Sequence, residues 1–387
     1  MIAGRDFIVF SDDWGRHPSS CQHLFRRLAP RNRVLWVNTI GTRTPTLSWH
    51  DVRRAAGKLR EWTSPAEDPA SEDVPVSVIR PFMTPFDRFR PLRSWNAGRL
   101  RAAVSREAAS QGLERTILLT TIPNAAGVVG RLGEALSVYY CVDEFSEWPG
   151  ADRRAMLDME AQLLERVDLV VAASETLFES KSARHARVRL LPHGVDWEGF
   201  RSGRGAAPAD LKALPHPRCG YAGLVDERLD MKLVADLARA MPEVTFVFVG
   251  PRQTPPGEAD GLPNVRFLPA VAYADVPAVV AELDAALLPY VTSRLTDRMN
   301  PLKLRELLAS GVPVVSSPLP EVKKYVPEVR LAADRDEWRG EIAAALHEGR
   351  SRAEERAERV RSEGWDARAE ELSRLLESAE AAARRAS

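Results

Sequence analysis

The chain has 387 residues, of which 44% are hydrophobic, and its 54 basic side chains balance 54 acidic ones. Because this length exceeds what one ordinary hydrophobic core supports, we expect two domains of roughly 150 to 200 residues each. Zero net charge provides no global field that would attract a nucleic acid or another polyanion. Any anionic ligand must therefore be held by a local site.

The three cysteines, Cys21, Cys141 and Cys219, are far apart and show neither metal-ligand nor CxxC spacing. This pattern indicates neither a disulfide framework nor a metal site, and it favours a reducing cytoplasmic compartment. The first residues contain charges at Arg5 and Asp6 and too short an apolar run for a signal peptide. No stretch approaches the roughly 18 apolar residues of a spanning helix, so we expect a cytoplasmic protein.

The first half of the chain alternates short apolar runs with longer helical patterns. Continuous apolar runs are typical of strands covered by helices on both faces, as in a parallel sheet. They predict an N-terminal Rossmann-like domain over residues 1–200. The runs are FIVFS at 7, VLWVN at 34, VSVIRP at 76, TILLTT at 116, VYYCV at 138 and LVVAAS at 169.

A second alternation follows residues 201–218, a segment rich in Gly, Pro and Ala that is interpreted as a linker. Five apolar runs, beginning at 219, 244, 265, 285 and 312, predict a second Rossmann-like domain over 219–364. The segment at about 365–387 is predicted to be a helix that packs back on the first domain. The fold class is therefore α/β, with two domains facing each other across a cleft at the carboxyl ends of their strands.

The stretch NPLKLRELLASGVPVVSS predicts a helix at about 301–310. Asn300 and Pro301 are suited to the N-cap and the first helical position, and Gly311 is suited to the residue after the last turn. The first turn of such a helix presents free backbone N–H groups and the positive end of the helix dipole. That end suits a phosphate group.

Lys303 and Glu306 lie three residues apart near this positive end. Lys303 suits an anion at the helix start, where a charge-assisted bond contributes roughly 1.5–3 kcal/mol. Glu306, one turn on, suits the vicinal diol of a ribose. The alternative interpretation is an ion pair between the two side chains on a solvated face, which contributes only about 0.2–0.5 kcal/mol.

Five segments resemble, in the same order, those of GT-B glycosyltransferases, in particular the family 4-like enzymes of teichuronic acid and exopolysaccharide biosynthesis. The resemblance covers nearly the whole chain and implies a hexosyltransferase with a nucleotide-diphosphate sugar as donor and no cofactor. The segments are VYYCVDEFSEWPG (138–150), LLERVDLVVAASETLFESK (163–181), LLPHGVD (190–196), GYAGLVDERLDMKLV (220–234) and NPLKLRELLASGVPVVSSPLPEV (300–322).

The resemblance implies that the predicted helix meets the donor nucleotide. Lys303 would bind the diphosphate and stabilise it as the leaving group without a metal, Glu306 would bind the ribose, and Asn300 would lie in the same site. The family commonly has another glutamate eight positions before Glu306, where this chain has Arg298. This departure leaves the sugar open, with Arg298 either a contact to a sugar carboxylate or a surface loop residue.

Two further residues of the second domain are candidates for the donor site. Gly223 ends the first strand of that domain, where the absence of Cβ lets backbone amides approach phosphate oxygens, or simply allows close packing. The family often places an arginine soon after this glycine. Here Arg228 is the nearest match, with a solvated face as its alternative.

Asp143 and Glu144 follow the strand VYYCV of the first domain. Inverting glucuronosyltransferases of the same fold use an aspartate in a similar place as general base, and Asp143 is the best match here. Glu144 is a candidate contact to the acceptor or sugar. The alternative is that Asp143 caps the next segment.

Three more candidates for acceptor or sugar contact come from loops of the first domain. Trp14 and Arg16 lie in the loop after the first strand, where Trp14 would stack on a sugar and Arg16 would meet a phosphate. A capped turn into the next helix is the alternative. His193 ends the last strand of the domain, where it is either a ligand contact or part of a hinge.

Two segments, 49–62 and 80–95, interleave aromatic residues with arginine and lysine. Together they resemble a peripheral patch for an anionic bilayer, where a lipid-linked acceptor would reside. Aromatic residues at helical spacing also occur in cores, which is the alternative.

The sequence thus predicts a glycosyltransferase that moves a sugar to a hydroxyl of a glycan or lipid-linked acceptor in cell-surface polysaccharide biosynthesis, at the inner face of the membrane and without nucleic acid. Two alternatives stay open: a nucleotide-sugar 2-epimerase of the same fold, and a two-lobed binding protein without catalysis.

Overall fold

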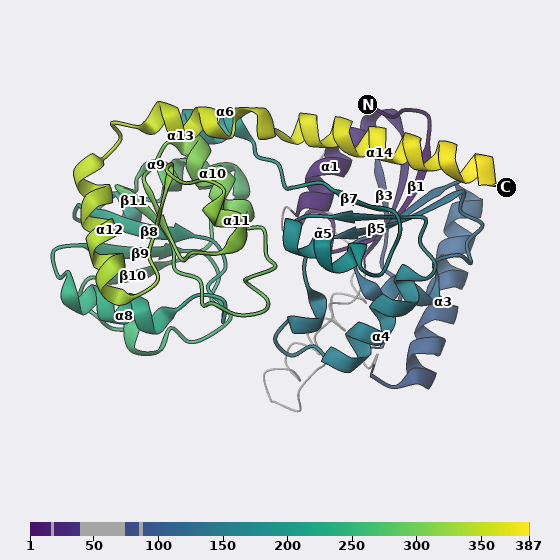
Figure 1. Ribbon diagram of the computed structural model, residues 1–387, viewed down its shortest axis with the longest axis horizontal. Helices are drawn as coiled ribbons and strands as arrows, with labels where there is room; N and C mark the ends of the chain where they lie inside the picture. The colour runs from purple at the N-terminus through teal and green to yellow at the C-terminus, as the bar shows by residue number, and fades with distance from the viewer. Residues whose placement is uncertain (17–18, 39–73, 85–87, 387) are drawn as a thin grey trace. The chain divides into compact units, whose positions relative to one another are not determined.

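The computed structural model describes residues 1–16, 19–38, 74–84 and 88–386, which form two compact units (Figure 1). The first unit contains Met1–Ala173, Leu177–Leu191 and Ala369–Ser387, and the second contains Ser174–Thr176 and Pro192–Arg368. Within the described part of the chain, no helix is long and apolar enough to cross a membrane.

The first unit is built on a parallel sheet of seven strands in the order β3-β2-β1-β4-β5-β6-β7. The central strand β1 pairs with β2 and β4, so that Phe7 lies opposite Val34 and Ile117. The strands are β1 Asp6–Ser11, β2 Arg33–Asn38, β3 Val76–Ile79, β4 Ile117–Thr120, β5 Leu136–Cys141, β6 Leu169–Ala172 and β7 Val188–Leu190. The helices are α1 Ser20–Leu28, α3 Arg90–Ser110, α4 Arg153–Leu164, α5 Glu175–Ser182 from Leu177 onward, and α14 Trp365–Ala386 from Ala369 onward.

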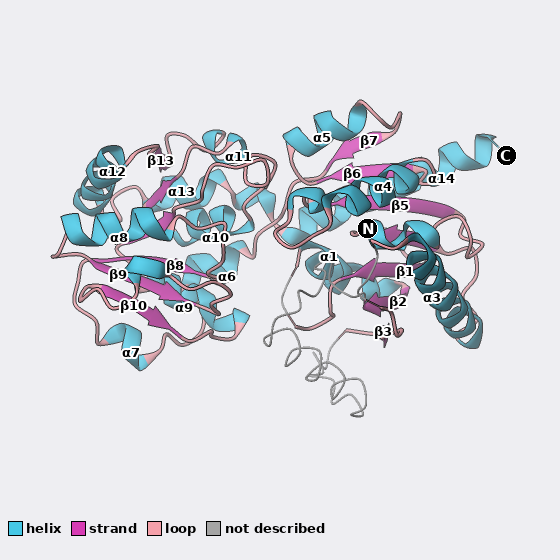
Figure 2. Cartoon of the chain, turned by 90° about the horizontal axis from the view of Figure 1, so that it is seen from below, coloured by secondary structure: helices cyan, strands magenta, loops and turns pink. Residues whose placement is uncertain are grey.

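The second unit repeats this architecture with six parallel strands in the order β10-β9-β8-β11-β12-β13, and helices lie on both faces of the sheet (Figure 2). Its strands are β8 Arg218–Ala222, β9 Thr245–Val249, β10 Val265–Leu268, β11 Ala285–Leu288, β12 Val314–Ser316 and β13 Val329–Leu331. Its helices are α6 Trp197–Ser202, α7 Ala209–Lys212, α8 Met231–Ala240, α9 Val276–Ala281, α10 Leu302–Ser310, α11 Pro320–Lys323, α12 Arg335–Glu348 and α13 Ala353–Arg359.

The predicted α/β class with two parallel-sheet units is confirmed, but the structure differs from the predicted linker. Residues 201–218 carry the end of α6, all of α7 and the start of β8. Leu211 is fully buried in the core of the second unit, and the buried Arg218 pairs with Glu282 at 2.9 Å. These residues therefore belong to the second unit. The composition of the segment resembles that of a loop, but the side chains of Leu211 and Arg218 fix it to the core of that unit.

Candidate active site

Gly223 and Lys303 meet at the carboxyl end of β8. Gly223 has a φ of 152°, and a Cβ built there would lie 2.1 Å from Cε and 2.4 Å from Nζ of Lys303. Gly250, after β9, has a φ of 148°, and its Cβ would lie 2.1 Å from the Gly223 carbonyl oxygen. Both positions require glycine, because L side chains rarely adopt these φ values and any Cβ would collide. Gly223 leaves room for the lysine side chain at the strand end, and Gly250 leaves room for the Gly223 carbonyl group.

Lys303 is the second residue of α10, close to the positive end of that helix. Its Nζ lies 5.5 Å from the centroid of the Tyr221 ring, which forms one wall around it. Burial lowers the pKa of Lys303, although the nearby Glu306 favours the charged form. Among the ion pairs of the described residues, none includes Lys303. An ammonium at a helix start that forms no ion pair with the described carboxylates is suited to an anionic ligand.

Glu306 is buried one turn along α10 and accepts a hydrogen bond from the Tyr273 hydroxyl at 2.8 Å. Burial raises the pKa of Glu306, while Lys303 and Tyr273 act in the opposite direction. The two residues therefore do not form the surface ion pair that the spacing also allowed. Tyr273 was not predicted, although it follows β10 and so lies at the same edge of the sheet as Gly223.

Arg228 lies in the loop between β8 and α8, not on a solvated helix face. Its Nη2 lies 2.8 Å from Oδ2 of Asp226, a buried carboxylate that the sequence interpretation missed. Burial opposes the charge on Arg228, but the hydrogen bonds and charge of Asp226 outweigh it, and the pKa of Arg228 is raised. Arg228 thus stays protonated in a fixed orientation.

Asn300 does not cap the helix α10, contrary to the prediction from the sequence. The helix α10 begins at Leu302 with Pro301 at its N-cap, and no side chain caps it. The buried Asn300 instead accepts a hydrogen bond from Nη1 of Arg305 at 2.7 Å. The N-cap prediction for Asn300 is therefore wrong, because its side chain turns to Arg305 on the inner face of the helix.

Arg298 and His193 occupy connecting segments of the second unit. Arg298 is half-buried in the loop before α10, where its N–H donates to the Leu295 carbonyl. His193 is buried, and its carbonyl oxygen accepts a hydrogen bond from Nε of Arg368 at 3.4 Å. Beside it, Gly194 packs against the Trp365 ring, where a Cβ would lie 2.7 Å from ring carbons. This packing fixes the backbone beside His193, and its predicted role, as a ligand contact or as part of a hinge, stays a prediction.

Asp143 and Glu144, after β5, have contrasting environments. The Asp143 carboxylate accepts a hydrogen bond from the Glu144 N–H at 2.9 Å. Glu144 is turned inward, where it accepts from the Ser146 hydroxyl at 2.7 Å and lies 3.3 Å from Nζ of Lys181. Lys181 also pairs with Glu160 at 2.6 Å. Glu144 therefore belongs to a buried ion-pair network, and not to the acceptor contacts among which it was predicted.

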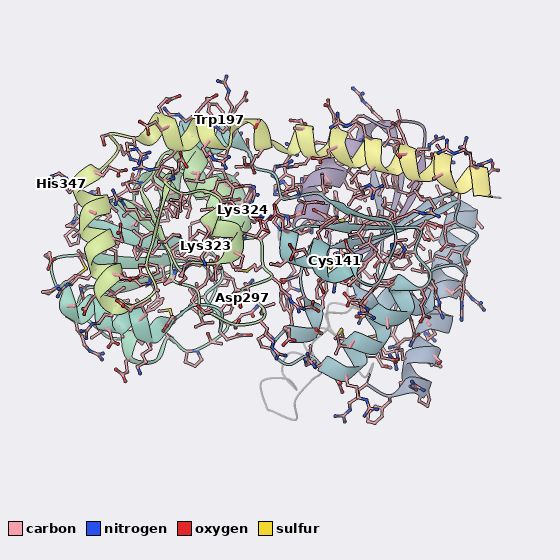
Figure 3. All side chains as sticks on the ribbon, viewed as in Figure 1. Cys141, Trp197, Asp297, Lys323, Lys324 and His347 are labelled. Atoms are coloured by element: carbon pink, nitrogen blue, oxygen red, sulfur yellow. The ribbon has the colours of Figure 1, made fainter. Side chains whose placement is uncertain are left out.

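Beneath these carboxylates, Cys141, labelled in Figure 3, ends strand β5. Its Sγ donates weakly to the Asp143 carbonyl oxygen at 3.6 Å, and burial raises the pKa of Cys141 to about 12. The thiol is therefore neutral and acts as packing beneath the strand end.

In the loop after β1, the structure describes residues 12–16 and 19. Trp14 donates its N–H to Oδ1 of Asn38 at 3.1 Å, and its ring lies 4.6 Å from that of Trp36, edge to face. Arg16 is exposed and pairs with Asp13 at 3.3 Å. Both predicted contacts thus already have partners within the first unit, although Trp14 is only half-buried.

Asp12, in the same loop, was not predicted. Its carboxylate accepts from the hydroxyls of Ser11 and Ser19 and from Nε2 of Gln22, at 2.6–2.8 Å. Burial raises the pKa of Asp12 against these hydrogen bonds. The residue fixes the turn and leaves its two oxygens occupied.

Across the described residues, no group of three or more His, Cys, Asp or Glu could hold a metal ion. The polar residues instead gather after the carboxyl ends of the parallel strands in each unit, as is general for ligand sites of open α/β sheets.

Two Rossmann-like units of this kind define the GT-B class of folds, and the resemblance to GT-B glycosyltransferases is confirmed. Residues 217–349 match the family model described as "Glycosyl transferases group 1". The chain is 29% identical over 181 residues to the "Putative teichuronic acid biosynthesis glycosyltransferase TuaH" of Bacillus subtilis (strain 168). That alignment covers 44% of this chain and 46% of TuaH, about half of the curated relative.

Solved structures share the fold over almost the whole chain. The sucrose-phosphate synthase of Thermosynechococcus elongatus has a TM-score of 0.70 and 18% identity over 98% of this chain and 100% of that chain. Anabaena Alr3699/HepE, solved in complex with UDP and glucose, has a TM-score of 0.64 and 17% identity, with 96% and 99% of the two chains covered. An Escherichia coli trehalose-6-phosphate protein bound to UDP-2-fluoro glucose has a TM-score of 0.63 and 14% identity, with 97% of this chain and 99% of that chain covered.

A substitution at Gly223 tests the contact with Lys303. Gly223→Ala is expected to weaken the binding of a nucleoside diphosphate about tenfold, because the new Cβ displaces an ammonium that would form a charge-assisted bond. Calorimetric titration measures this. Gly340→Ala is the control, since a Cβ in that exposed position of α12 meets nothing within 4 Å. Equal affinities for the wild type and Gly223→Ala would contradict the assignment.

Proposed function

We propose that the chain is a glycosyltransferase that moves a sugar from a nucleotide-diphosphate donor to a hydroxyl of a glycan or lipid-linked acceptor. The observation that carries the proposal is the Lys303 ammonium, held between Gly223 and the start of α10, with Glu306 one turn further on. These groups suit a diphosphate and the ribose attached to it. The family match over residues 217–349 supports this use of the second unit.

The proposed donor is a UDP-sugar. UDP or a UDP-sugar analogue is present in two of the similar structures, although their identity to this chain is only 14–17%. In the reaction, the bond between the anomeric carbon and the diphosphate breaks while the acceptor oxygen bonds to that carbon. Lys303 and the dipole of α10 stabilise the negative charge on the leaving diphosphate. Asp143 accepts the proton of the acceptor hydroxyl.

The experiment that tests this function combines binding and turnover. UDP, GDP and ADP, with their glucose or glucuronic acid conjugates, are titrated into the full chain, and release of the nucleoside diphosphate is then followed with a panel of lipid-linked and glycan acceptors. The proposal expects one nucleotide to bind best and acceptor-dependent release from its sugar. Binding without release would indicate a binding protein, and release of a 2-epimer without acceptor would indicate an epimerase.

The role in cell-surface polysaccharide synthesis is part of the proposal. It is supported by the name of the Bacillus relative and by an exposed aromatic patch in the first unit. Four of the six exposed large hydrophobic side chains among the described residues belong to this patch, with exposed fractions of 36–47%: Phe82, Phe89, Leu92 and Trp95. Residues 49–62, the other predicted membrane segment, lie outside the described residues.

Arginines surround the aromatic patch. The Arg99 guanidinium lies 5.0 Å from the Trp95 ring centroid and 5.8 Å from that of Phe82, and Arg88 lies 4.5 Å from Phe89. Amphipathic aromatic rings lie at headgroup level in a bilayer, and arginines contribute about 1 kcal/mol each at an anionic surface. We propose that this patch binds an anionic membrane at its cytoplasmic face, where a lipid-linked acceptor is available.

Removing the rings of the patch tests membrane binding. Phe89→Ala with Trp95→Ala is expected to weaken binding to vesicles of phosphatidylglycerol and phosphatidylcholine by at least about tenfold, since each large apolar side chain contributes roughly 1.5 kcal/mol or more when buried. Vesicle co-sedimentation is the measurement, and Val326→Ala, an equally exposed apolar residue of the second unit, is the control. If the wild type fails to sediment with anionic vesicles at low salt, the membrane proposal is wrong.

A further inference from the structure

A second polar cavity lies in the first unit, away from the carboxyl ends of the strands. It has a volume of about 570 Å³. Asp6 and Arg33, two of its lining residues, are the first residues of β1 and β2, and Arg115 precedes β4. Because these strands are parallel, the cavity lies at the amino ends of the sheet, whereas Asp12 and Asp143 follow the carboxyl ends of β1 and β5. We call it the amino-end cavity.

Ion pairs fix the floor of the amino-end cavity. Arg33 holds Asp6 with two hydrogen bonds, from Nε to Oδ1 at 2.7 Å and from Nη2 to Oδ2 at 2.5 Å. Arg5 pairs with Glu380 of α14 at 3.0 Å, and both carboxylates are buried. The negative charges of the floor are therefore already neutralised, and its geometry is rigid.

The rim of the cavity carries a net positive charge, because three arginines line it against one exposed carboxylate, that of Glu114. Arg31, Arg115 and Arg384 line it and are exposed, and none of the ion pairs found among the described residues includes them. Five arginines in all line the cavity, against three carboxylates. The guanidinium groups come from three separate segments of the chain, so the fold itself concentrates them.

Arg115 adopts a conformation that the sequence does not favour. Its φ is 48°, and among the described residues it is the only non-glycine residue with positive φ. The preceding Glu114 donates its N–H to Oδ2 of Asp6 at 2.7 Å, which ties this turn to the floor of the cavity. Strained backbone of this kind is retained where the surroundings fix it, often beside a ligand site.

We propose that the amino-end cavity is a binding site for a small phosphorylated molecule that carries at least two negative charges. Guanidinium groups bind phosphate oxygens in pairs of parallel hydrogen bonds. Three such groups that form no ion pair with the residues the structure describes suit more than one oxyanion. The volume of about 570 Å³ is within the usual range for small-molecule sites and suits a small molecule. The site is separate from the proposed donor site, and the inference does not depend on the proposed function.

Inorganic pyrophosphate is the probe for this site. Calorimetric titration uses the full chain carrying Lys303→Met, so that the proposed donor site does not contribute. Saturable binding is expected, and Arg115→Ala with Arg384→Ala is expected to weaken it at least tenfold. Arg385→Ala, at the neighbouring exposed residue that does not line the cavity, is the matched control and is expected to leave the affinity unchanged.

Three results would overturn the proposal: the absence of saturable pyrophosphate binding, equal binding by the double variant, or equal weakening by Arg385→Ala, which would indicate diffuse surface attraction. A second variant, Arg115→Gly, separates binding from folding. Because glycine adopts positive φ without strain, this variant is expected to have a higher Tm and weaker pyrophosphate binding. A higher Tm with unchanged affinity would also count against the site.

Discussion

Lys303→Met is expected to lower kcat/KM for sugar transfer by about 10- to 150-fold, the equivalent of one charge-assisted hydrogen bond of roughly 1.5–3 kcal/mol. The methionine retains an unbranched apolar chain that fits beside Gly223 and Tyr221, so the loss reports the charge and not a cavity. Initial rates at varied donor concentration are the measurement. If the bond strengthens as the diphosphate leaves, kcat falls together with kcat/KM.

Lys212→Ala is the matched control for this substitution. Lys212 is an exposed lysine of α7, in the same unit but before the amino end of β8. It is expected to leave kcat/KM unchanged. Equal activity of Lys303→Met and the wild type would contradict the role assigned to the ammonium.

The affinity of the wild type for the diphosphate should also depend on pH through the Lys303 ammonium. Burial lowers the pKa of Lys303, so the unliganded enzyme loses the ammonium at a lower pH than an ordinary lysine does. Affinity for the diphosphate is therefore expected to fall as pH rises through that lowered pKa. In Lys303→Met this alkaline loss should be absent.

Asp143→Asn is expected to reduce turnover by about 10²- to 10⁴-fold, the usual contribution of a general base, while donor binding stays unchanged. Asparagine keeps the side-chain oxygen that accepts the Glu144 N–H, so the turn after β5 is retained. Turnover is measured with saturating donor and acceptor, and donor affinity is measured by calorimetry.

Glu144→Gln provides the contrast, because the two carboxylates are adjacent but differ in their surroundings. Removing the Glu144 charge leaves Lys181 with Glu160 alone in a buried network, so Tm should fall. Asp143→Asn should leave Tm nearly unchanged. Full activity of Asp143→Asn would exclude it as the base.

Strands such as β1 and β5 were predictable from the sequence because every residue in them is buried and most are apolar, which produces the runs FIVF and VYYC. The edge strand β13 was not, because it is three residues long and contains Arg330, which pairs with Glu341 and Glu348. The predicted linker failed for a related reason. Local composition does not reveal that Leu211 packs into a distant core.

In the candidate site, too, features set by neighbouring residues were predictable, whereas contacts between residues distant in the sequence were not. Lys303 and Glu306 were predictable because helix position and spacing are local properties. That Lys303 fills the space left by Gly223, 80 positions earlier, depends on the sheet bringing the two together. The inward ion-paired position of Glu144 likewise depends on Lys181 of α5 and Glu160 of α4, which are distant in the sequence.

We propose that the second unit holds a nucleoside diphosphate through Lys303. The most direct test is calorimetric titration of UDP and of uridine into the wild type and into Lys303→Met. We expect the wild type to bind UDP more tightly than uridine, and Lys303→Met to lose most of this difference while its affinity for uridine is unchanged. Failure of the wild type to bind UDP, or an unchanged difference between UDP and uridine in Lys303→Met, would contradict the role of Lys303 in diphosphate binding.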